Sequence, residues 1–272
     1  MVELLRRGYR VRTTVRDLAR EERVRAAIGG EVESDERLSF AVADLLHDDG
    51  WQQAATGCEY VLHVASPFPR RQPKDPDELI VPAREGTVRA LRAGLDAGAR
   101  RVVVTSSVAA IRGSAAAGSR PLTEEDWSDP TDTGMTPYAR SKTAAELAAW
   151  ELVRERGEAE RLAVVNPGAI LGPVRSDDLS YSLELVQRLL RGMPGVPRIG
   201  FSVVDVRDVA GLEVRAMALL DPGVRSIVGD LGKRVEVSSE KARTRLGWST
   251  RPPEETIVDC ARSLIDAEAK GA

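Results

Sequence analysis

Apolar runs rich in Val, Leu and Thr alternate along this chain with segments in which apolar residues recur at helical spacing. The runs predict strands over residues 9–15, 38–43, 60–64, 101–105 and 162–165. The helical segments lie at residues 17–28, 77–97, 138–156, 182–191 and from 206 onward. Strands that alternate with helices are typical of βαβ units around a parallel sheet. The pattern therefore predicts an α/β protein with a doubly wound parallel sheet.

The remaining segments predict a long loop and shorter elements. Residues 111–135 are rich in Gly, Ser, Pro and Asp, which is typical of a loop. A short strand is expected near residues 199–204, and a last helix follows two prolines near residue 252. We divide the chain into a dinucleotide-binding domain, residues 1–166, and a small, reduced substrate lobe with the C-terminal helices, residues 167–272, integrated with the first.

The start of the sequence predicts the end of a helix, which Gly8 stops. In a dinucleotide-binding fold, a strand and a Gly-rich turn come before this helix and hold the pyrophosphate. Neither precedes residue 9, so we expect a sheet that lacks its first strand, with two strand edges either unpaired or paired directly. A wrongly chosen start or truncated fragment and a chain that has lost cofactor binding are both consistent with this pattern.

Three polar residues form a candidate set for proton transfer. Tyr138 and Lys142 are four residues apart, and therefore lie on one face of a helix. A nearby ammonium would lower the pKa of the phenol. Ser107 ends a buried strand, at the edge of the sheet where ligands bind, and its hydroxyl can hold a carbonyl oxygen while Tyr138 protonates it. The alternative is that Ser106 and Ser107 form local caps and that Lys142 is a solvated charge.

With these residues, the chain resembles the extended short-chain dehydrogenase/reductases of the NAD-dependent epimerase/dehydratase superfamily, in their dihydroflavonol-reductase-like and bacterial aldehyde or ketone reductase branch. The matching stretches are residues 13–17, 43–45, 62–67, 105–107, 138–142 and 166–168. The resemblance implies a Rossmann fold, a nicotinamide cofactor and hydride transfer to an aldehyde or ketone. It implies that Ser107, Tyr138 and Lys142 are catalytic, and that Lys142 also bonds the nicotinamide ribose. Near residues 217–220 the chain departs from the family pattern, because it passes almost at once to the tail helices.

Residues that follow the predicted strands are candidates for cofactor binding. Arg16 stands where an acidic residue would bond the ribose of NAD, and an arginine there can accept the 2′-phosphate of NADP. We therefore expect NADP, with NAD as the alternative, and Arg23 as a second phosphate contact. The other candidates are Asp44, Leu45, Val64, Ala65, Ser66, Thr105, Ser106, Tyr138, Lys142, Pro167, Gly168 and Ile170. Simpler explanations stay open, since Arg16 can be a surface arginine, Asp44 a turn residue and Pro167-Gly168 a turn.

A substrate pocket is expected from residues 67–69, the loop 111–135 and residues 170–205. Three apolar side chains there could form its walls or belong to the core: Phe68, Ile170 and Tyr181. His63 stands within an apolar strand, and we expect it to be a packed core histidine rather than an acid.

Composition and charge exclude several other classes of protein. The net charge is −3 with both signs spread along the chain, which argues against a nucleic-acid or membrane-surface partner. No apolar run reaches the length of a bilayer span, and the first residues do not form a secretory signal. Cys58 and Cys260 make no CxxC pattern and fit a reducing cytoplasmic compartment, while His47 and His63 lack metal-ligand spacing. We expect no metal.

These observations favour an NAD(P)H-dependent reductase, monomeric or homodimeric, that acts on a small-molecule carbonyl substrate. Two alternatives are a non-catalytic binding or regulatory relative and a sugar-nucleotide epimerase or dehydratase, which shares the three catalytic residues. The stretch 64–67 favours the reductase.

Overall fold

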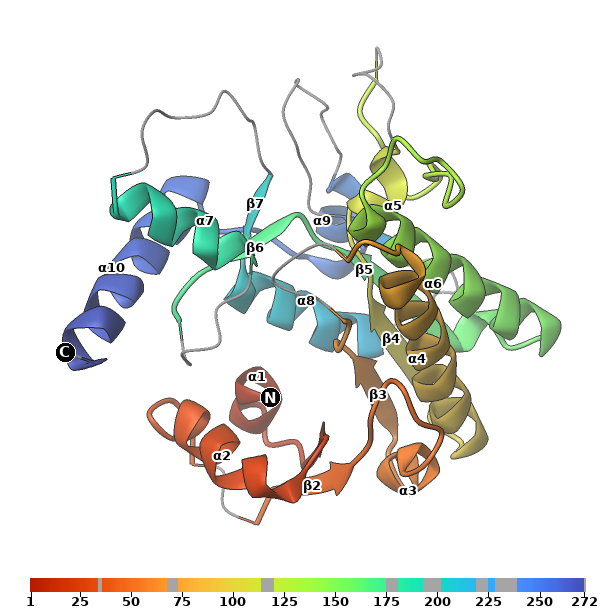
Figure 1. Cartoon of the computed structure of the whole chain (residues 1–272). Helices are drawn as coiled ribbons and strands as arrows, with labels where there is room; N and C mark the ends of the chain where they lie inside the picture. Colours follow the sequence, from red (N-terminus) through yellow and green to blue (C-terminus); the bar gives the residue numbers. More distant parts are fainter. Residues whose placement is uncertain are drawn as a thin grey trace.

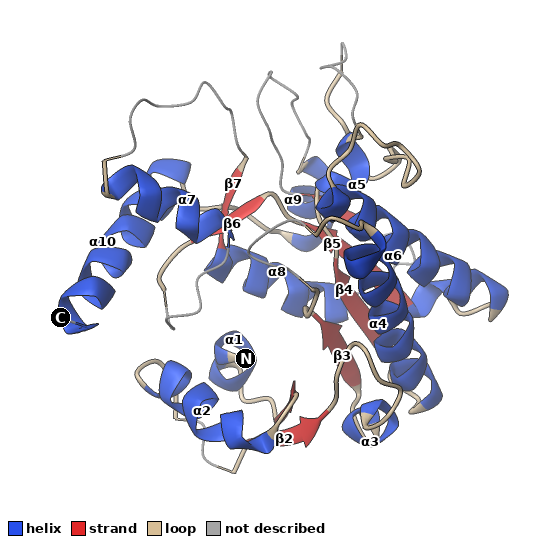
Figure 2. Ribbon diagram, in the orientation of Figure 1, coloured by secondary structure: helices blue, strands red, loops and turns tan. Residues whose placement is uncertain are grey.

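The computed structural model describes residues 1–33, 36–67, 73–113, 120–174, 181–192, 202–218, 225–227 and 239–271. Its strands are β1 (Val11–Val15), β2 (Leu38–Val42), β3 (Tyr60–His63), β4 (Arg101–Thr105), β5 (Leu162–Asn166), β6 (Ala169–Leu171), β7 (Val203–Asp205) and β8 (Arg225–Ile227). Its helices are α1 (Val2–Arg6), α2 (Glu21–Gly29), α3 (Trp51–Ala55), α4 (Asp77–Asp96), α5 (Ala109–Arg112), α6 (Pro137–Glu155), α7 (Tyr181–Leu190), α8 (Val206–Ala218), α9 (Glu240–Leu246) and α10 (Pro253–Gly271). Figures 1 and 2 show their arrangement.

A parallel sheet in the order β3-β4-β5-β8 forms the centre of the molecule. Alternate residues of β4 and β5 face opposite sides, as the two-residue period of a strand requires. One side packs against α4 and α6 through a cluster that includes Val102, Val104, Leu162 and Val164. The opposite side packs against α8 and α9. Helices therefore cover both faces, which confirms the predicted doubly wound α/β fold.

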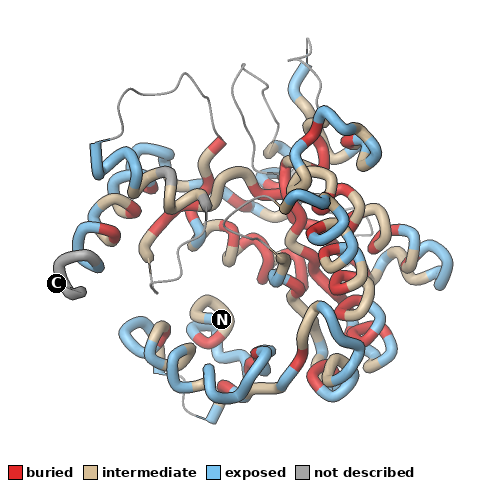
Figure 3. Tube along the Cα trace, viewed as in Figure 1, coloured by how far each residue is buried: buried red, intermediate tan, exposed pale blue. Residues whose placement is uncertain are grey.

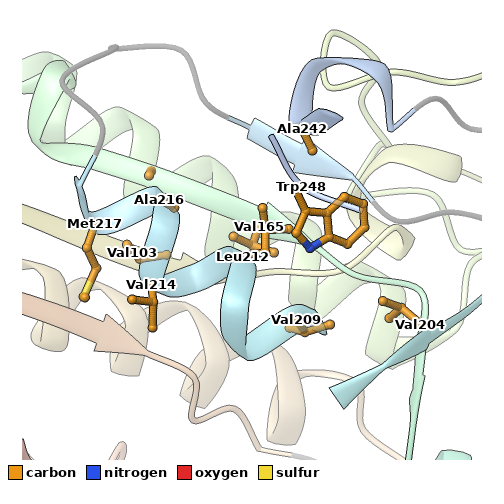
Figure 4. Packing of buried hydrophobic residues seen from close by; sticks show 11 residues of the cluster. Val103, Val165, Val204, Val209, Leu212, Val214, Ala216, Met217, Ala242 and Trp248 are labelled. Carbon is orange, nitrogen blue, oxygen red and sulfur yellow. The ribbon is translucent and has the colours of Figure 1, made fainter. Parts of the chain in front are cut away.

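The second face of this sheet holds a cluster of buried hydrophobic side chains, shown in Figure 4. The cluster joins Val103 of β4 and Val165 of β5 to Leu212 of α8 and to Trp248, which follows α9. The Trp248 indole also donates a hydrogen bond of 3.1 Å to the carbonyl of Asp208, so that its buried N–H is satisfied. This packing ties the C-terminal segment to the central sheet.

The N-terminal segment forms a separate two-stranded parallel sheet, β1-β2, covered by α1 and α2. Its small core contains Leu5, Val11, Ile28 and Leu38. Among the described residues, β1 pairs with β2 and β3 pairs with β4, and β1 does not pair with β3. Of the two arrangements expected for a sheet without its first strand, the structure shows the one in which the two edges do not pair directly. Figure 3 shows more exposed residues along this segment than along the central sheet.

The sequence did not predict the short elements α3, α5, β6 and β8. Each has three to five residues, too few for a hydrophobic period to be recognised. The predicted strand near 199–204 is observed as β7, while residues 199–201 and the expected shortening at 219–220 lie outside the described residues. The division at residue 166 stays a prediction. Within the described part of the chain, no helix has the length and apolar character needed to span a bilayer.

Gly94 tests the packing of α4 on the central sheet. A Cβ at this position would lie 2.8 Å from Val102 Cγ2 and 3.1 Å from Val61 Cγ2, two stiff side chains on adjacent strands. We expect Gly94→Ala to lower the free energy of unfolding by about 1–3 kcal/mol, measured by urea denaturation. Gly211→Ala in α8 is the control, since its Cβ meets nothing within 4 Å. This control should be neutral or stabilising by up to about 1 kcal/mol. A Gly94→Ala chain as stable as the unaltered chain would contradict the packing.

Candidate active site

The carboxyl ends of β3, β4 and β5 meet at one edge of the central sheet, because the three strands are parallel. Backbone hydrogen bonds extend the β4-β5 pairing beyond the strands, from Ser106 N to Val165 O at 2.7 Å and from Val108 N to Pro167 O at 3.1 Å. These bonds hold Ser107 beside the segment that follows β5. The edge is where ligands bind in open α/β sheets.

Helix α6 brings Tyr138 and Lys142 to this edge. The helix begins with Pro137 after Thr136, whose hydroxyl accepts a hydrogen bond of 3.2 Å from Ala139 N. Tyr138 forms a side-chain hydrogen bond with Ser107. The Lys142 ammonium donates a hydrogen bond of 3.1 Å to the carbonyl of Thr105 at the end of β4. The structure therefore brings the three predicted catalytic residues together, while their catalytic role stays a prediction.

Burial controls the ionisation of this group of residues. It raises the pKa of Tyr138, and the hydrogen bond with Ser107 acts in the opposite direction. Lys142 is 7% exposed, and burial lowers the pKa of its ammonium to about 8, against the opposing charge of Glu146. We expected Lys142 to lower the pKa of Tyr138, but burial outweighs any such effect here and the phenol stays protonated at neutral pH. The Lys142 ammonium instead contacts the Thr105 carbonyl.

Two further carboxylates near this edge were not predicted from the sequence. Glu146 is 0% exposed and lies 2.7 Å from the Asn166 side-chain nitrogen. Glu213 of α8 is also buried and accepts a hydrogen bond of 2.6 Å from the Thr105 hydroxyl, while burial raises the pKa of its carboxyl. The four-residue spacing of Tyr138, Lys142 and Glu146 was a signal for the first. No local pattern identifies Glu213, because 108 residues separate it from Thr105.

The predicted cofactor residues also follow the strand ends, but their surroundings differ. Asp44 accepts a hydrogen bond of 3.0 Å from Leu46 N, so it is a turn residue in this structure. Leu45 packs against Gly86. Val64 is 54% exposed although it is apolar and follows β3. Ala65 is exposed, and Ser66 is half-buried.

The remaining predicted cofactor residues are two arginines and the residues that follow β5. Arg16 and Arg23 are both exposed, one directly after β1 and one in α2. Pro167 is buried and Gly168 half-buried. Ile170 packs against the core cluster of α8, which favours its alternative role as a core residue.

A buried hydroxyl group at the end of β4 is consistent with a ligand that binds at this edge. The hydroxyl oxygen of Ser106 is buried and has no hydrogen-bond partner among the described residues. A buried polar group without a partner is rare, and a bound molecule would satisfy it. Together with the exposed Val64 and the small residues after it, Ser106 fits the nicotinamide end of a dinucleotide.

His63 is buried, and its Nε2 atom forms a hydrogen bond of 3.3 Å with the Thr87 hydroxyl. Burial first, and the charge of Lys142 second, lower the pKa of His63 to about 4. The structure confirms the prediction of a packed core histidine.

Several predicted features cannot be placed. Phe68, residues 114–119 of the long loop and residues 175–180 and 193–201 of the expected substrate region lie outside the described residues, as does the side chain of Tyr181. Within the described ranges, Cys58 and Cys260 are free thiols, and no three His, Cys, Asp or Glu side chains are grouped to hold a metal.

Comparison with known proteins identifies the family of this chain and several relatives that are named as reductases. Residues 1–226 match the family described as "NAD dependent epimerase/dehydratase family". The chain is 39% identical over 217 residues to cinnamoyl-CoA reductase 1 of Oryza sativa subsp. japonica, covering 78% of this chain and 61% of that protein. It is 34% identical over 223 residues to cinnamoyl-CoA reductase CAD2 of Medicago truncatula, covering 78% and 66%. The chain thus spans about two thirds or less of the length of these relatives.

The fold matches a solved structure over nearly the whole chain. The crystal structure of yeast methylglyoxal/isovaleraldehyde reductase Gre2 complexed with NADPH has a TM-score of 0.85 and 26% identity, and the match covers 98% of this chain and 94% of that one. These matches confirm the predicted Rossmann-like fold and the resemblance to the reductase branch.

The low pKa of His63 predicts a specific loss of stability in acid. The unfolded histidine takes up a proton below its ordinary pKa of 6.5, whereas the folded one resists protonation until about 4. The stability that neutral His63 contributes is therefore fully present above pH 6.5 and is lost as the pH falls toward 4. We expect His63→Gln to remove roughly 2–3 kcal/mol of this pH dependence, measured by denaturant unfolding between pH 7 and 4. His47→Gln, at an exposed position, should leave the dependence unchanged. Identical acid sensitivity in the two variants would show that folding does not lower the pKa of His63.

Proposed function

The chain belongs to the NAD dependent epimerase/dehydratase family, and from this premise we propose that it is an NAD(P)H-dependent reductase that converts an aldehyde or ketone to an alcohol. The observation that carries the proposal is the hydrogen bond between Tyr138 and Ser107 beside a buried Lys142, at the ligand-binding edge of the sheet. Three relatives, at 34%, 39% and 33% identity, support a reductase over an epimerase, since they are named as two cinnamoyl-CoA reductases and a tetraketide alpha-pyrone reductase.

The three residues have distinct tasks in this reaction. The nicotinamide, when bound, supplies a hydride to the carbonyl carbon. Tyr138 donates its phenolic proton to the carbonyl oxygen, and Ser107 donates a hydrogen bond to the same oxygen. Tyr138 is half-buried, and a phenol with a raised pKa is protonated at neutral pH, as a proton donor must be. The Lys142 ammonium stabilises the phenolate that remains after the transfer.

The chain's own residues would hold two ends of the cofactor. Ser106 and the residues after β3 and β5 would lie against the nicotinamide, and Lys142 would bond its ribose. Arg16 would accept the 2′-phosphate of NADP at the other end, with Arg23 as a second contact. We further propose a cytoplasmic protein that is a monomer or a homodimer.

The role of Tyr138 is tested by Tyr138→Phe, which removes the hydroxyl and keeps the ring. Reduction of an aldehyde panel with NADPH should slow by about 10²–10⁴-fold, the usual contribution of a positioned acid. NADPH affinity should change little, because Lys142 and the strand ends remain. Tyr9→Phe, at an exposed tyrosine, is the control. If Tyr138→Phe kept its activity while His63→Gln lost it, the assignment of Tyr138 as the acid would be wrong. If the unaltered chain reduced no carbonyl, the proposed activity would be wrong.

The cofactor preference is tested at Arg16. We expect the unaltered chain to bind NADPH more tightly than NADH, and Arg16→Ala to weaken NADPH binding by roughly ten- to a hundredfold with NADH binding unchanged. Titration calorimetry measures both. Arg10→Ala, an exposed arginine just before β1, is the matched control. Equal NADPH affinity in the Arg16→Ala and unaltered chains would exclude a phosphate contact at this position.

A further inference from the structure

Two fully buried polar side chains lie behind the candidate active site, Glu146 of α6 and Asn166 at the end of β5. The Asn166 side-chain nitrogen lies 2.7 Å from Glu146 Oε2 and 3.3 Å from the carbonyl oxygen of Ser107. A carboxylate at 0% exposure is strongly destabilising unless charges and hydrogen bonds compensate it. The groups around Glu146 must therefore include those that compensate its burial.

The neighbours of Asn166 determine which way its amide faces. Glu146 Oε2 and the Ser107 carbonyl are both acceptors, so the NH₂ group must point toward them. The opposite atom, Asn166 Oδ1, is buried and has no partner among the described residues. The amide thus connects helix α6 to the backbone of Ser107 while its own acceptor is left unsatisfied.

Glu146 lies one helical turn beyond Lys142, on the same face of α6. Its negative charge raises the pKa of Lys142 and so opposes the effect of burial. The other titratable groups near this lysine are His63 of β3, neutral at pH 7, Tyr138 of α6, and Glu213 of α8, which bonds the Thr105 hydroxyl. Glu146 is therefore the carboxylate whose charge acts on the ammonium.

We infer that Glu146 and Asn166 are positioning residues that hold the Lys142 ammonium and the Ser107 backbone in a fixed relation to each other. Both are buried behind the reacting groups, so they act through Lys142 and Ser107 and not on a substrate. The inference deepens the proposed function and rests on it for the roles of those two residues.

The titration of Lys142 tests this directly, by NMR of the full chain labelled with ¹³C-lysine and without cofactor. The lysines of the sequence are Lys74, Lys142, Lys233, Lys241 and Lys270. Loss of one signal in Lys142→Arg assigns the resonance. In the unaltered chain, Lys142 should titrate at a pH of about 8, below an ordinary lysine.

Glu146→Gln keeps the shape of the side chain and removes its charge, so the midpoint of Lys142 should fall by about one unit or more. Glu146→Asp keeps the charge, so its Lys142 midpoint should stay closer to that of the unaltered chain. Asn166→Leu removes the hydrogen bond that holds Glu146 in place, so the carboxylate acts less on Lys142 and the Lys142 midpoint should fall toward that of Glu146→Gln. Glu151→Gln, at an exposed carboxylate of the same helix, should leave it unchanged. A purely structural role would not produce this order.

An unchanged Lys142 midpoint in folded Glu146→Gln would overturn the inference, and an unchanged midpoint in Asn166→Leu would remove Asn166 from it. If Glu146→Gln does not fold, Asn166→Leu decides alone, and an unchanged Lys142 midpoint in that variant then overturns the inference.

These outcomes are separate from those of the proposed function. The titration needs neither cofactor nor substrate, so it can succeed in a chain that reduces no carbonyl. Activity lost in Tyr138→Phe with no effect of Glu146 on Lys142 would support the reductase and reject only the positioning pair.

Discussion

The parallel register between β4 and β5 is the constraint on which the candidate site depends. Thr105 lies opposite Val165, and hydrogen bonds continue the pairing to Ser106 and Val108. This register places the Thr105 carbonyl where Lys142 contacts it and Ser107 where Tyr138 contacts it. A slip of one residue would turn either Val103 or Val165 away from the core of α8 and would separate both contacts.

Helix α6 combines packing and charge on the side that faces the sheet. Ala149, Trp150 and Val153 belong to the hydrophobic cluster with α4, while Lys142 and Glu146 lie buried in the preceding turns. Burial of opposite charges is tolerated when each has hydrogen-bond partners. The Thr105 carbonyl and the Asn166 amide supply those partners, so the polar contacts depend on the same docking of α6 that the apolar contacts stabilise.

The N-terminal segment is joined to the central sheet by side chains. The Arg12 guanidinium of β1 donates hydrogen bonds to the carbonyls of Ala54 and Thr56, at 3.1 and 2.6 Å, shortly before β3 begins. In this arrangement β1 ends at Val15, directly before Arg16, the residue proposed to contact a cofactor phosphate. The adenosine end and the nicotinamide end of the proposed site thus belong to two different sheets, and their relative placement depends on contacts such as that of Arg12.

The order and type of the long elements follow from the sequence alone, because their hydrophobic periods and end signals are local. The boundaries of α4 and α6 and the trio Ser107, Tyr138 and Lys142 were predicted in this way. The tertiary structure decided what depends on contacts between distant residues: the bond from Asn166 to Glu146, the contact of Glu213 with Thr105, and the separation of β1 from β3. It also decided the ionisation of Tyr138. The four-residue spacing predicts a lowered pKa, but burial by other elements raises it, and burial is a property of the folded chain that no local pattern contains.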